Sequence, residues 1–494
     1  MRENRKVNMS KLLIGWSETD ITPVTDKKIS LSGQYYARYT REIHSRLKFT
    51  AVAFSSGDEH FLTGSMDNVG MQQAFHNLVQ DAVVALEPAI KKENIFLNAI
   101  HTHSAPAASV TVNPGAVLKL KDDPEVLSAK EYVEFVVPIM AKCLVDAWNN
   151  RKAGGIARAF GNARIGHCRR AVYSTGKAEM YGDTTRRDFI GMEAGEDSGV
   201  DMLFTFDEAG KKTGMLLNVA CPSQVMESTY KVSADFAGAT RELLKTAYGD
   251  DFHTIYQISP AGCQSPRDLV RHYTTEPDFW HEDGVVEHAN RLFHAVTTAV
   301  PGAIDYDPVL KVTDMTVTLP RRRASYAAYV AAKAELARLT AIQPEAEAFE
   351  DFCAETHANE KIDGPGPYDS KLHHFVLIKN EQAVITRYEN QDETPNLTFH
   401  MNVIRLGDIA IANNPFELYL YFGQIIKARS KAAQTFLVQL SAGAAPYHAG
   451  YLPSPAAEIY GGYGGLIING QVGSDGGYKL CDDTVEAINK LFEE

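Results

Sequence analysis

Two histidines separated by one residue are the first candidates for chemistry in this sequence. His101 and His103 stand in the stretch NAIHTHSAP, residues 98–106, directly after the apolar run at residues 95–97. In an extended strand, residues two apart point to the same face about 7 Å from each other, so both imidazoles could reach one centre if the strand continues through them. Such a pair can bind a metal ion, transfer protons or fill a buried pocket, and the pattern alone leaves all three roles open.

The composition narrows the class of protein and the kind of partner. The chain has 494 residues, of which 45% are hydrophobic and 22% charged, as in ordinary globular proteins with a large core. The formal net charge of −13 argues against nucleic acid or an anionic membrane as the main partner. We therefore expect a small-molecule substrate, while the oligomeric state is left open.

The distribution of cysteines and apolar segments indicates an intracellular address. The six cysteines have no paired spacing, so a disulfide framework is not expected. No stretch reaches the roughly 20 apolar residues that a transmembrane helix needs. The basic N-terminus, MRENRKVNMSKLLIGW, lacks an apolar segment of signal-peptide length. We expect a cytoplasmic protein.

Hairpin signals mixed with long helices predict the class of fold. Turn residues between apolar runs indicate hairpins with turns at residues 55–58, 207–210 and 407–408. Hairpins combined with helices favour an α/β fold with a mixed β-sheet core and flanking helices over a regular doubly wound sheet. Apolar periodicity predicts the main helices over residues 72–86, 131–148, 235–248, 325–339, 415–427 and 483–492.

Several short stretches occur in the order found in one family of hydrolases. They are GWSETDITP from residue 15, IHSRL from residue 43, HTHSAP from residue 101, NPFEL from residue 414, and YLPSP from residue 451 followed by YGG. The chain resembles the catalytic domain of the neutral ceramidase family over most of its length. The resemblance implies a single ceramidase-like catalytic domain across residues 1–494, without the C-terminal immunoglobulin-like domain that many relatives carry.

The resemblance also implies a zinc site. Carried over position by position, the family's metal ligands fall on His101, Glu417 and Tyr451. The family's second histidine ligand falls on Cys221, in the stretch NVACPSQVM at residues 218–226. A cysteine thiolate is a good zinc ligand, so Cys221 is a candidate fourth ligand. The alternative is that Cys221 is a core thiol and that the metal is weak, different or absent.

Four further residues become candidates for catalysis by the same resemblance. Ser265, in SPAGCQSPRDL, matches a serine important for hydrolysis, although its neighbours differ from those in the family. Arg164, in GNARIG, aligns with an arginine that holds the scissile amide oxygen. Tyr463 matches a second active-site tyrosine, which can donate a proton to an oxyanion. His103 is expected to transfer a proton.

Other arginines point toward the nature of the substrate. Arg169 and Arg170 could bind an anionic group of the substrate bidentately. Arg267 stands where the family has an asparagine. Together with the absence of an export signal, these residues favour a soluble substrate over ceramide.

The implied function is that of a zinc-dependent amidohydrolase, in which the metal polarises an amide carbonyl and activates water. Two alternatives stay open. One is a hydrolase of a soluble, non-lipid compound that is carbohydrate-like, a glycoside or a lactone. The other is a catalytically silent binding protein with the same fold, which would purify without stoichiometric zinc.

Overall fold

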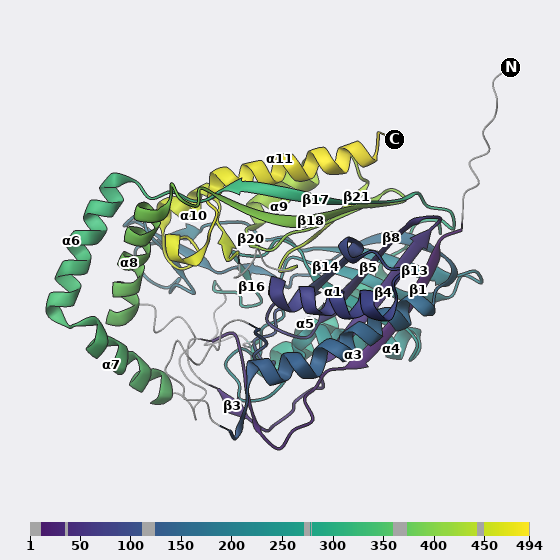
Figure 1. Ribbon diagram of the computed structural model, residues 1–494, viewed down its shortest axis with the longest axis horizontal. Coiled ribbons are helices and arrows are strands. Elements are labelled where there is room, and N and C mark those ends of the chain that lie inside the picture. Colours follow the sequence, from purple (N-terminus) through teal and green to yellow (C-terminus); the bar gives the residue numbers. More distant parts are fainter. Residues whose placement is uncertain are drawn as a thin grey trace.

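Two β-sheets packed face to face form the centre of the molecule (Figure 1). The computed structural model describes residues 11–34, 38–110, 124–270, 277, 279–358, 373–441 and 449–493, so most of the basic N-terminal stretch lies outside the described residues. The larger sheet has eight strands, in the order β15 (His253–Ile258), β14 (Lys212–Val219), β13 (Gly199–Asp207), β8 (Lys152–Asn162), β1 (Leu13–Asp20), β4 (Lys48–Ser56), β5 (Glu59–Met66) and β6 (Ile95–Ala99). The smaller sheet has four, in the order β17 (Leu310–Pro320), β18 (Asn396–Leu406), β19 (Ile409–Asn413) and β21 (Gln434–Val438).

Helices cover the outer face of each sheet, which gives four layers in all (Figure 1). The alternation of side chains along a strand explains this arrangement. In β4, Phe49 and Ala51 pack with the helices, whereas Val52 and Phe54 fill the space between the two sheets. The larger sheet is covered by α1 (Gln73–Leu86), α3 (Ala129–Asn149), α4 (Asp235–Tyr248) and α5 (His281–Thr298), and the smaller by α9 (Leu420–Arg429) and α11 (Ser474–Leu491).

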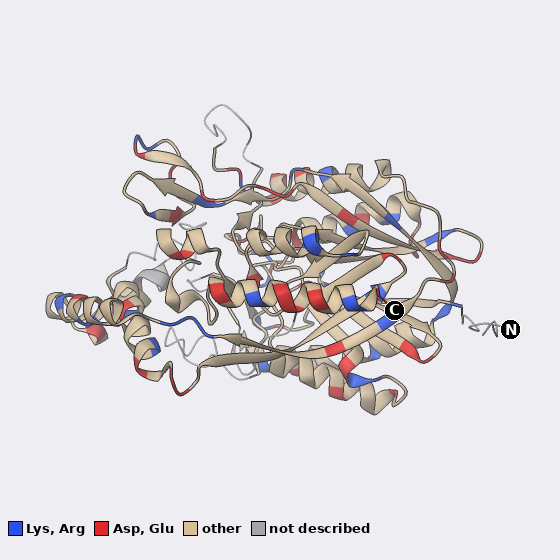
Figure 2. Ribbon diagram, turned by 90° about the horizontal axis from the view of Figure 1, so that it is seen from above, with Lys and Arg blue, Asp and Glu red and all other residues tan. Residues whose placement is uncertain are grey.

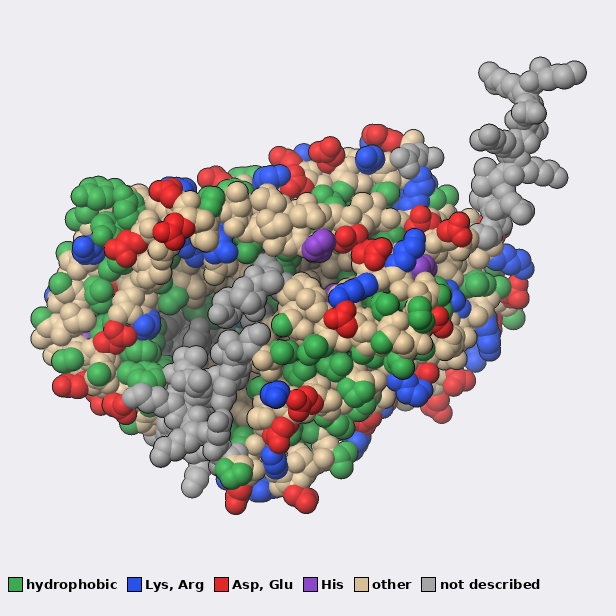
Figure 3. Space-filling model, in the orientation of Figure 1, with side chains coloured by type: hydrophobic (Ala, Val, Ile, Leu, Met, Phe, Trp, Pro, Cys, Tyr) green, Lys and Arg blue, Asp and Glu red, His purple; other side chains and the backbone are tan. Residues whose placement is uncertain are grey.

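Three helices project from one end of this body (Figure 1). They are α6 (Tyr326–Ile342), α7 (Glu345–Ala358) and α8 (His374–Asn390), and they share a small core of Leu339, Ala348 and Ile378. Figure 2 shows both acidic and basic positions along α11, the helix that leads to the C-terminus, and Figure 3 shows both signs of charge interspersed over one face of the molecule. Within the described part of the chain, no helix has the length and apolar character needed to cross a membrane.

Short strands and helices complete the fold around the ends of the two sheets. Two of these small pairings matter for the site, because β20 pairs with β22 and β9 pairs with β16. The smaller elements are β2 (Lys28–Ser30), β3 (Tyr39–Thr40), β7 (Val126–Leu127), β9 (His167–Cys168), β10 (Arg170–Tyr173), β11 (Ala178–Met180), β12 (Phe189–Met192), β16 (Gln264–Ser265), β20 (Glu417–Leu418), β22 (Tyr451–Leu452) and α10 (Pro455–Tyr460).

The structure confirms the mixed α/β fold and the hairpins predicted from the turn residues. The predicted turns join β4 to β5, β13 to β14 and β18 to β19, each pair antiparallel. The helix predicted over residues 415–427 is wrong at its start, because Glu417 lies in β20 and α9 begins only at Leu420. The closing helix begins at Ser474, earlier than expected, and two glycines in its first turn pack closely, Gly476 against the end of β17 and Gly477 against Phe422 of α9.

Buried polar side chains tie the two sheets together at one end of their strands. The side-chain oxygen of Gln439 accepts the backbone N–H groups of Ala261 (3.0 Å) and Leu418 (3.1 Å). The side-chain amide of Asn218 donates to the carbonyl of Leu437 across the sheets (2.9 Å). Strands β6, β14, β15, β19 and β21 all end on this side of the two sheets. The segments that follow these strands therefore meet in one region.

Removing the Gln439 side-chain oxygen should loosen this junction. Gln439→Leu would leave two buried backbone N–H groups without an acceptor, at a cost of about 2–4 kcal/mol in the free energy of unfolding. Urea unfolding followed by tryptophan fluorescence would measure the loss. A change below about 0.5 kcal/mol would contradict a structural role for this amide.

Candidate active site

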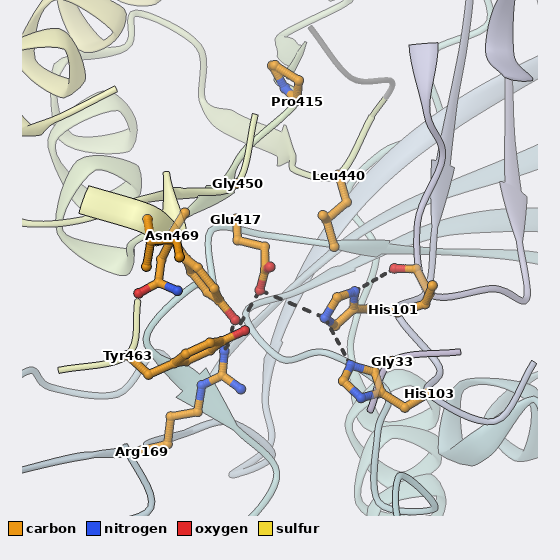
Figure 4. A pocket seen from close by; sticks show the side chains of 13 residues that line it. Gly33, His101, His103, Arg169, Pro415, Glu417, Leu440, Gly450, Tyr463 and Asn469 are labelled. Atoms are coloured by element: carbon orange, nitrogen blue, oxygen red, sulfur yellow. Dashed lines mark hydrogen bonds and ion pairs between the residues drawn. The ribbon is translucent and has the colours of Figure 1, made fainter. Parts of the chain in front are cut away.

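One cavity of about 400 Å³ opens where the segments after the strands meet. Its polar lining includes His101, His103, Arg169 and Glu417, whose side chains point toward one another in Figure 4. A cavity of this size with a few convergent polar groups has the character of a small-molecule site. The remaining lining residues are Gly33, Val69, Pro415, Leu440, Gly450, Tyr451, Tyr463, Ile468 and Asn469.

The two histidines meet through a turn and not along a strand. Strand β6 ends at Ala99, and His101 has a φ of +63°, so the chain leaves the extended conformation before the second histidine. Their Nε2 atoms are 3.3 Å apart, and the ring planes lie at 75° to each other. The prediction that the two imidazoles converge is therefore confirmed. The predicted cause, a strand that continues through both residues, is wrong.

The surroundings of both imidazoles favour the neutral form. The Nδ1 atom of His101 lies 2.5 Å from the carbonyl oxygen of Val69, which fixes the ring with Nε2 toward the cavity. Burial lowers the pKa of His101, although Glu417 opposes the shift. Burial lowers the pKa of His103 still further, and the nearby His101 and Arg38 add to the effect.

Glu417 and Tyr451 enter the cavity side by side because their backbones are paired. They are direct partners in the parallel pair of β20 and β22, so their side chains project from the same face. The Glu417 Oε2 atom lies 3.8 Å from His101 Nε2 and 3.8 Å from Arg169 Nη2. The structure thus brings together His101, Glu417 and Tyr451, which are far apart in the sequence.

Arg169 is the arginine that reaches this cavity. Its Nη2 donates to the phenolic oxygen of Tyr451 (3.2 Å) and to the carbonyl of Gly262 (3.1 Å), and its side chain is only 2% exposed. Arg164, which the sequence assigned to the scissile carbonyl, lies elsewhere. It is 57% exposed and forms ion pairs with Glu196 and Asp268, both at 3.3 Å. Of these two arginines only Arg169 lines the cavity. It directly follows strand β9, and its side chain is buried, whereas that of Arg164 is exposed.

Arg170 has a different task from the anion binding considered from the sequence. It is fully buried, and its Nε donates to Glu193 at 2.7 Å. Its Nη atoms donate to the carbonyls of Gly461 and Tyr463. Arg170 therefore holds the loop that places the Tyr463 ring in the cavity, where it meets the Tyr451 ring edge-on with 5.5 Å between centroids.

Ser265 is buried and does not belong to the cavity lining. Its Oγ accepts a hydrogen bond from Tyr181 Oη at 2.9 Å and another from the backbone N–H of Arg267 at 3.2 Å. Tyr181 has a φ of +55°, and its ring lies 5.8 Å from the Arg169 guanidinium carbon. Ser265 is therefore connected to the cavity through Tyr181, a residue that no motif in the sequence had indicated.

Cys221 lies in the core and is not part of the cavity lining. Its side chain is fully buried in the apolar cluster behind the cavity, where Sγ contacts the carbonyls of Ile165 (3.6 Å) and Pro222 (3.4 Å). Burial raises the pKa of the thiol well above its usual value, which disfavours a thiolate. The resemblance in sequence predicted a metal ligand at this position, but a thiol ends one bond beyond Cβ, whereas an imidazole would extend further by a whole ring.

Glu227 is a second residue of this region, after Tyr181, that sequence reasoning missed. It follows Pro222 by five positions and carries no motif, so nothing in the sequence marks it. Its Oε2 lies 3.5 Å from His103 Nδ1, and its side chain is 5% exposed. Burial raises the pKa of Glu227 to about 7, while the positive charges of Arg169 and Arg38 act in the opposite direction.

The donors at the cavity fit a divalent metal ion in their chemistry. Imidazole nitrogen, carboxylate and phenolate oxygen are all zinc ligands or compatible with zinc. The backbone carbonyl on Nδ1 of His101 is the outer contact that metal-bound histidines generally have. Among the described residues, however, no three His, Cys, Asp or Glu side chains stand at the full spacing of a metal group, so Glu417 must move closer to complete one.

Comparison with solved structures gives the relationship of the fold. The crystal structure of neutral ceramidase from Pseudomonas aeruginosa aligns with a TM-score of 0.66 over 97% of this chain and 75% of that one, at 16% sequence identity. The fold is neutral-ceramidase-like. A ceramidase complexed with C2 aligns with the same TM-score over 97% and 76% of the two chains, at 15% identity. No protein-family profile and no curated protein sequence matches the chain.

Gly33 supports the His103 ring, and this contact can be tested. A Cβ at Gly33 would lie 2.4 Å from His103 Cγ, so Gly33→Ala should displace the imidazole. Gly176→Ala is the matched control, because Gly176 also has a positive φ but has no atom within 4 Å of the added carbon. The positive φ should cost about 1 kcal/mol in stability in both variants, and the contact with the His103 ring adds to this cost only in Gly33→Ala.

Histidine-labelled protein gives the readout for this pair of variants. In nitrogen NMR, the imidazole signals of His101 and His103 should shift in Gly33→Ala and stay in place in Gly176→Ala. Unchanged imidazole signals in Gly33→Ala would contradict the close packing.

Proposed function

We propose that this protein is a metal-dependent hydrolase that cleaves an amide (N-acyl) bond in a small, polar substrate. The observation that carries the proposal is the convergence of His101, Glu417, Tyr451 and Arg169 on one cavity. A neutral-ceramidase-like fold supports the same class of reaction. A bound zinc ion would polarise the substrate carbonyl and lower the pKa of a water molecule.

The cavity's own residues provide the positioning that hydrolysis needs. The Arg169 guanidinium stands beside Glu417 and Tyr451 and offers a fixed positive charge to an oxyanion. Tyr463 adds a phenol at the same wall. Removing one donor to an oxyanion typically costs about 10²–10³ in kcat. In this arrangement Arg169 takes the role that the sequence assigned to Arg164.

The Ser265 hydroxyl has a supporting place in this proposal. It accepts two hydrogen bonds, from Tyr181 and from the Arg267 backbone, so its own proton can be donated further. Since Ser265 is not a lining residue, a direct attack on the substrate would require a rearrangement of Tyr181. We assign Ser265 to holding Tyr181 against Arg169.

The lining favours a compact polar substrate over a two-chain lipid. Charged, phenolic and imidazole groups occupy the centre of the cavity, and a volume of about 400 Å³ suits a small molecule. The described apolar lining side chains are few, and they are Val69, Pro415, Leu440 and Ile468. N-acylated amino acids and amino sugars have the size and polarity that this lining can accept.

A substrate panel tests the proposed reaction. Catalytic efficiency should be measured on N-acylated amino acids and amino sugars, and on short- and long-chain ceramides in detergent, with zinc present. We expect kcat/KM for the best soluble compound to exceed that for every ceramide. Efficient ceramide hydrolysis with no turnover of the soluble compounds would contradict the substrate proposal and leave the reaction class intact.

Removal of the first histidine tests the metal dependence. His101→Ala should lose the bound metal and lower kcat/KM by about 10³-fold or more, since metal polarisation contributes several kcal/mol. His400→Ala is the control, because His400 has a 70% exposed side chain on β18. A His101→Ala protein with wild-type metal content and turnover would refute the proposal.

A further inference from the structure

The Nε2 atoms of His101 and His103 face each other across 3.3 Å at the wall of the cavity. A neutral imidazole carries one N–H, and an oxygen atom lies on the Nδ1 side of each ring, hydrogen-bonded for His101 and only nearby for His103. The oxygen beside His101 is the carbonyl of Val69 at 2.5 Å, and that beside His103 belongs to the Glu227 carboxylate at 3.5 Å. With both protons on Nδ1, two lone pairs face each other across 3.3 Å. Such a contact is repulsive. Either a proton on one of the two Nε2 atoms, which makes the contact a hydrogen bond, or a positive ion beside both atoms removes this repulsion.

The separation of the two nitrogens matches that of ligands on one metal ion. Zinc–nitrogen bonds of about 2.1 Å in a tetrahedral site put two ligand atoms about 3.4 Å apart. The observed distance of 3.3 Å is within 0.2 Å of that value. Glu417 Oε2 lies 3.8 Å from His101 Nε2, and its side chain is 18% exposed, so a small movement of the carboxylate would bring it to the same centre.

Resting on the proposed function, we propose that His103, held by the Glu227 carboxylate, is a metal ligand in this chain. In the family pattern the second histidine ligand falls on position 221, which is a cysteine in this chain. His103 would supply the second imidazole ligand instead. The metal centre is then formed by His101, His103 and Glu417, with Tyr451 beside them. His103 would bind the metal instead of transferring protons, which was its role as expected from the sequence.

The contacts around His103 support a fixed ligand. Gly33 packs against the ring so closely that a Cβ would collide with it. The guanidinium of Arg38, which is fully buried, donates to the His103 carbonyl and to the carbonyls of Ser32 (2.8 Å) and Thr229 (2.9 Å). The backbone and the ring of His103 are therefore both held in place.

Glu227 has the position of a supporting carboxylate. Among the described residues, His103 Nδ1 and Glu227 Oε2 have no hydrogen-bond partner, and the two atoms lie 3.5 Å apart. A carboxylate behind a metal-bound imidazole fixes its tautomer and raises its basicity, and its loss typically lowers metal affinity about 10–100-fold. Cys221 has no comparable contact with the cavity, because its thiol is enclosed by the core.

Metal binding by the full-length protein tests the assignment without using activity. Chelator-treated protein would be titrated with zinc in a metal buffer, and cobalt would be substituted to record its absorption spectrum. His103→Ala should weaken zinc binding by at least about 100-fold, and Glu227→Gln by about 10–100-fold. Cys221→Ser should bind zinc as the wild type does, and the cobalt protein should lack a thiolate charge-transfer band.

The outcomes separate this inference from the proposed function. Wild-type zinc affinity in both His103→Ala and His103→Gln, in a wild type that binds the metal, would overturn the ligand assignment and leave a metal-dependent hydrolase. A charge-transfer band that disappears in Cys221→Ser would overturn it in favour of the thiolate. A wild-type protein that binds neither zinc nor cobalt at micromolar concentration would overturn both the inference and the metal dependence. Circular dichroism of each variant verifies that the fold is retained.

Discussion

Gln439 joins the two sheets at the place where the cavity opens, and the geometry of the site depends on this junction. Its side-chain oxygen accepts hydrogen bonds from two backbone N–H groups. One belongs to Ala261, which follows β15 of the larger sheet, and the other to Leu418, which follows β19 of the smaller sheet. Its own backbone N–H donates to the carbonyl of Ile258. Because these groups are buried, any shift between the sheets would leave them unsatisfied. The relative position of the segments that follow the strands is therefore tightly constrained.

This constraint lets residues from both sheets form one site. His101 comes from the segment after β6 in the larger sheet, and Glu417 from the segment after β19 in the smaller one. A further bond crosses between the sheets at the same end, since Ser441 Oγ donates to the carbonyl of Leu97 at 2.9 Å. The distance of 3.8 Å between His101 and Glu417 is thus set by the packing of two layers and not by local sequence.

Burial shapes the charges of the cavity as much as the identity of its residues. Two imidazoles, two carboxyl groups and the Arg169 guanidinium stand close together, and their side chains are at most 18% exposed. In such surroundings each charge is strongly felt by its neighbours. Glu227 shows the balance well, since burial raises its pKa while Arg169 and Arg38 favour its charged form. In the proposed metal centre, a cation beside the two Nε2 atoms would take the place of the proton that otherwise joins them.

The sequence by itself determined the class of fold, the hairpins, most helices and several of the residues that meet in the cavity. Turn residues and apolar periodicity are local signals, so they can be recognised without the rest of the chain. The short motifs HTHSAP and NPFEL contain His101, His103 and Glu417, which line the cavity. Only the tertiary structure decided which arginine enters the cavity, that Cys221 remains in the core, and that Glu227 stands behind His103. These facts depend on the reach of individual side chains and on contacts between segments far apart in sequence, which no local pattern records.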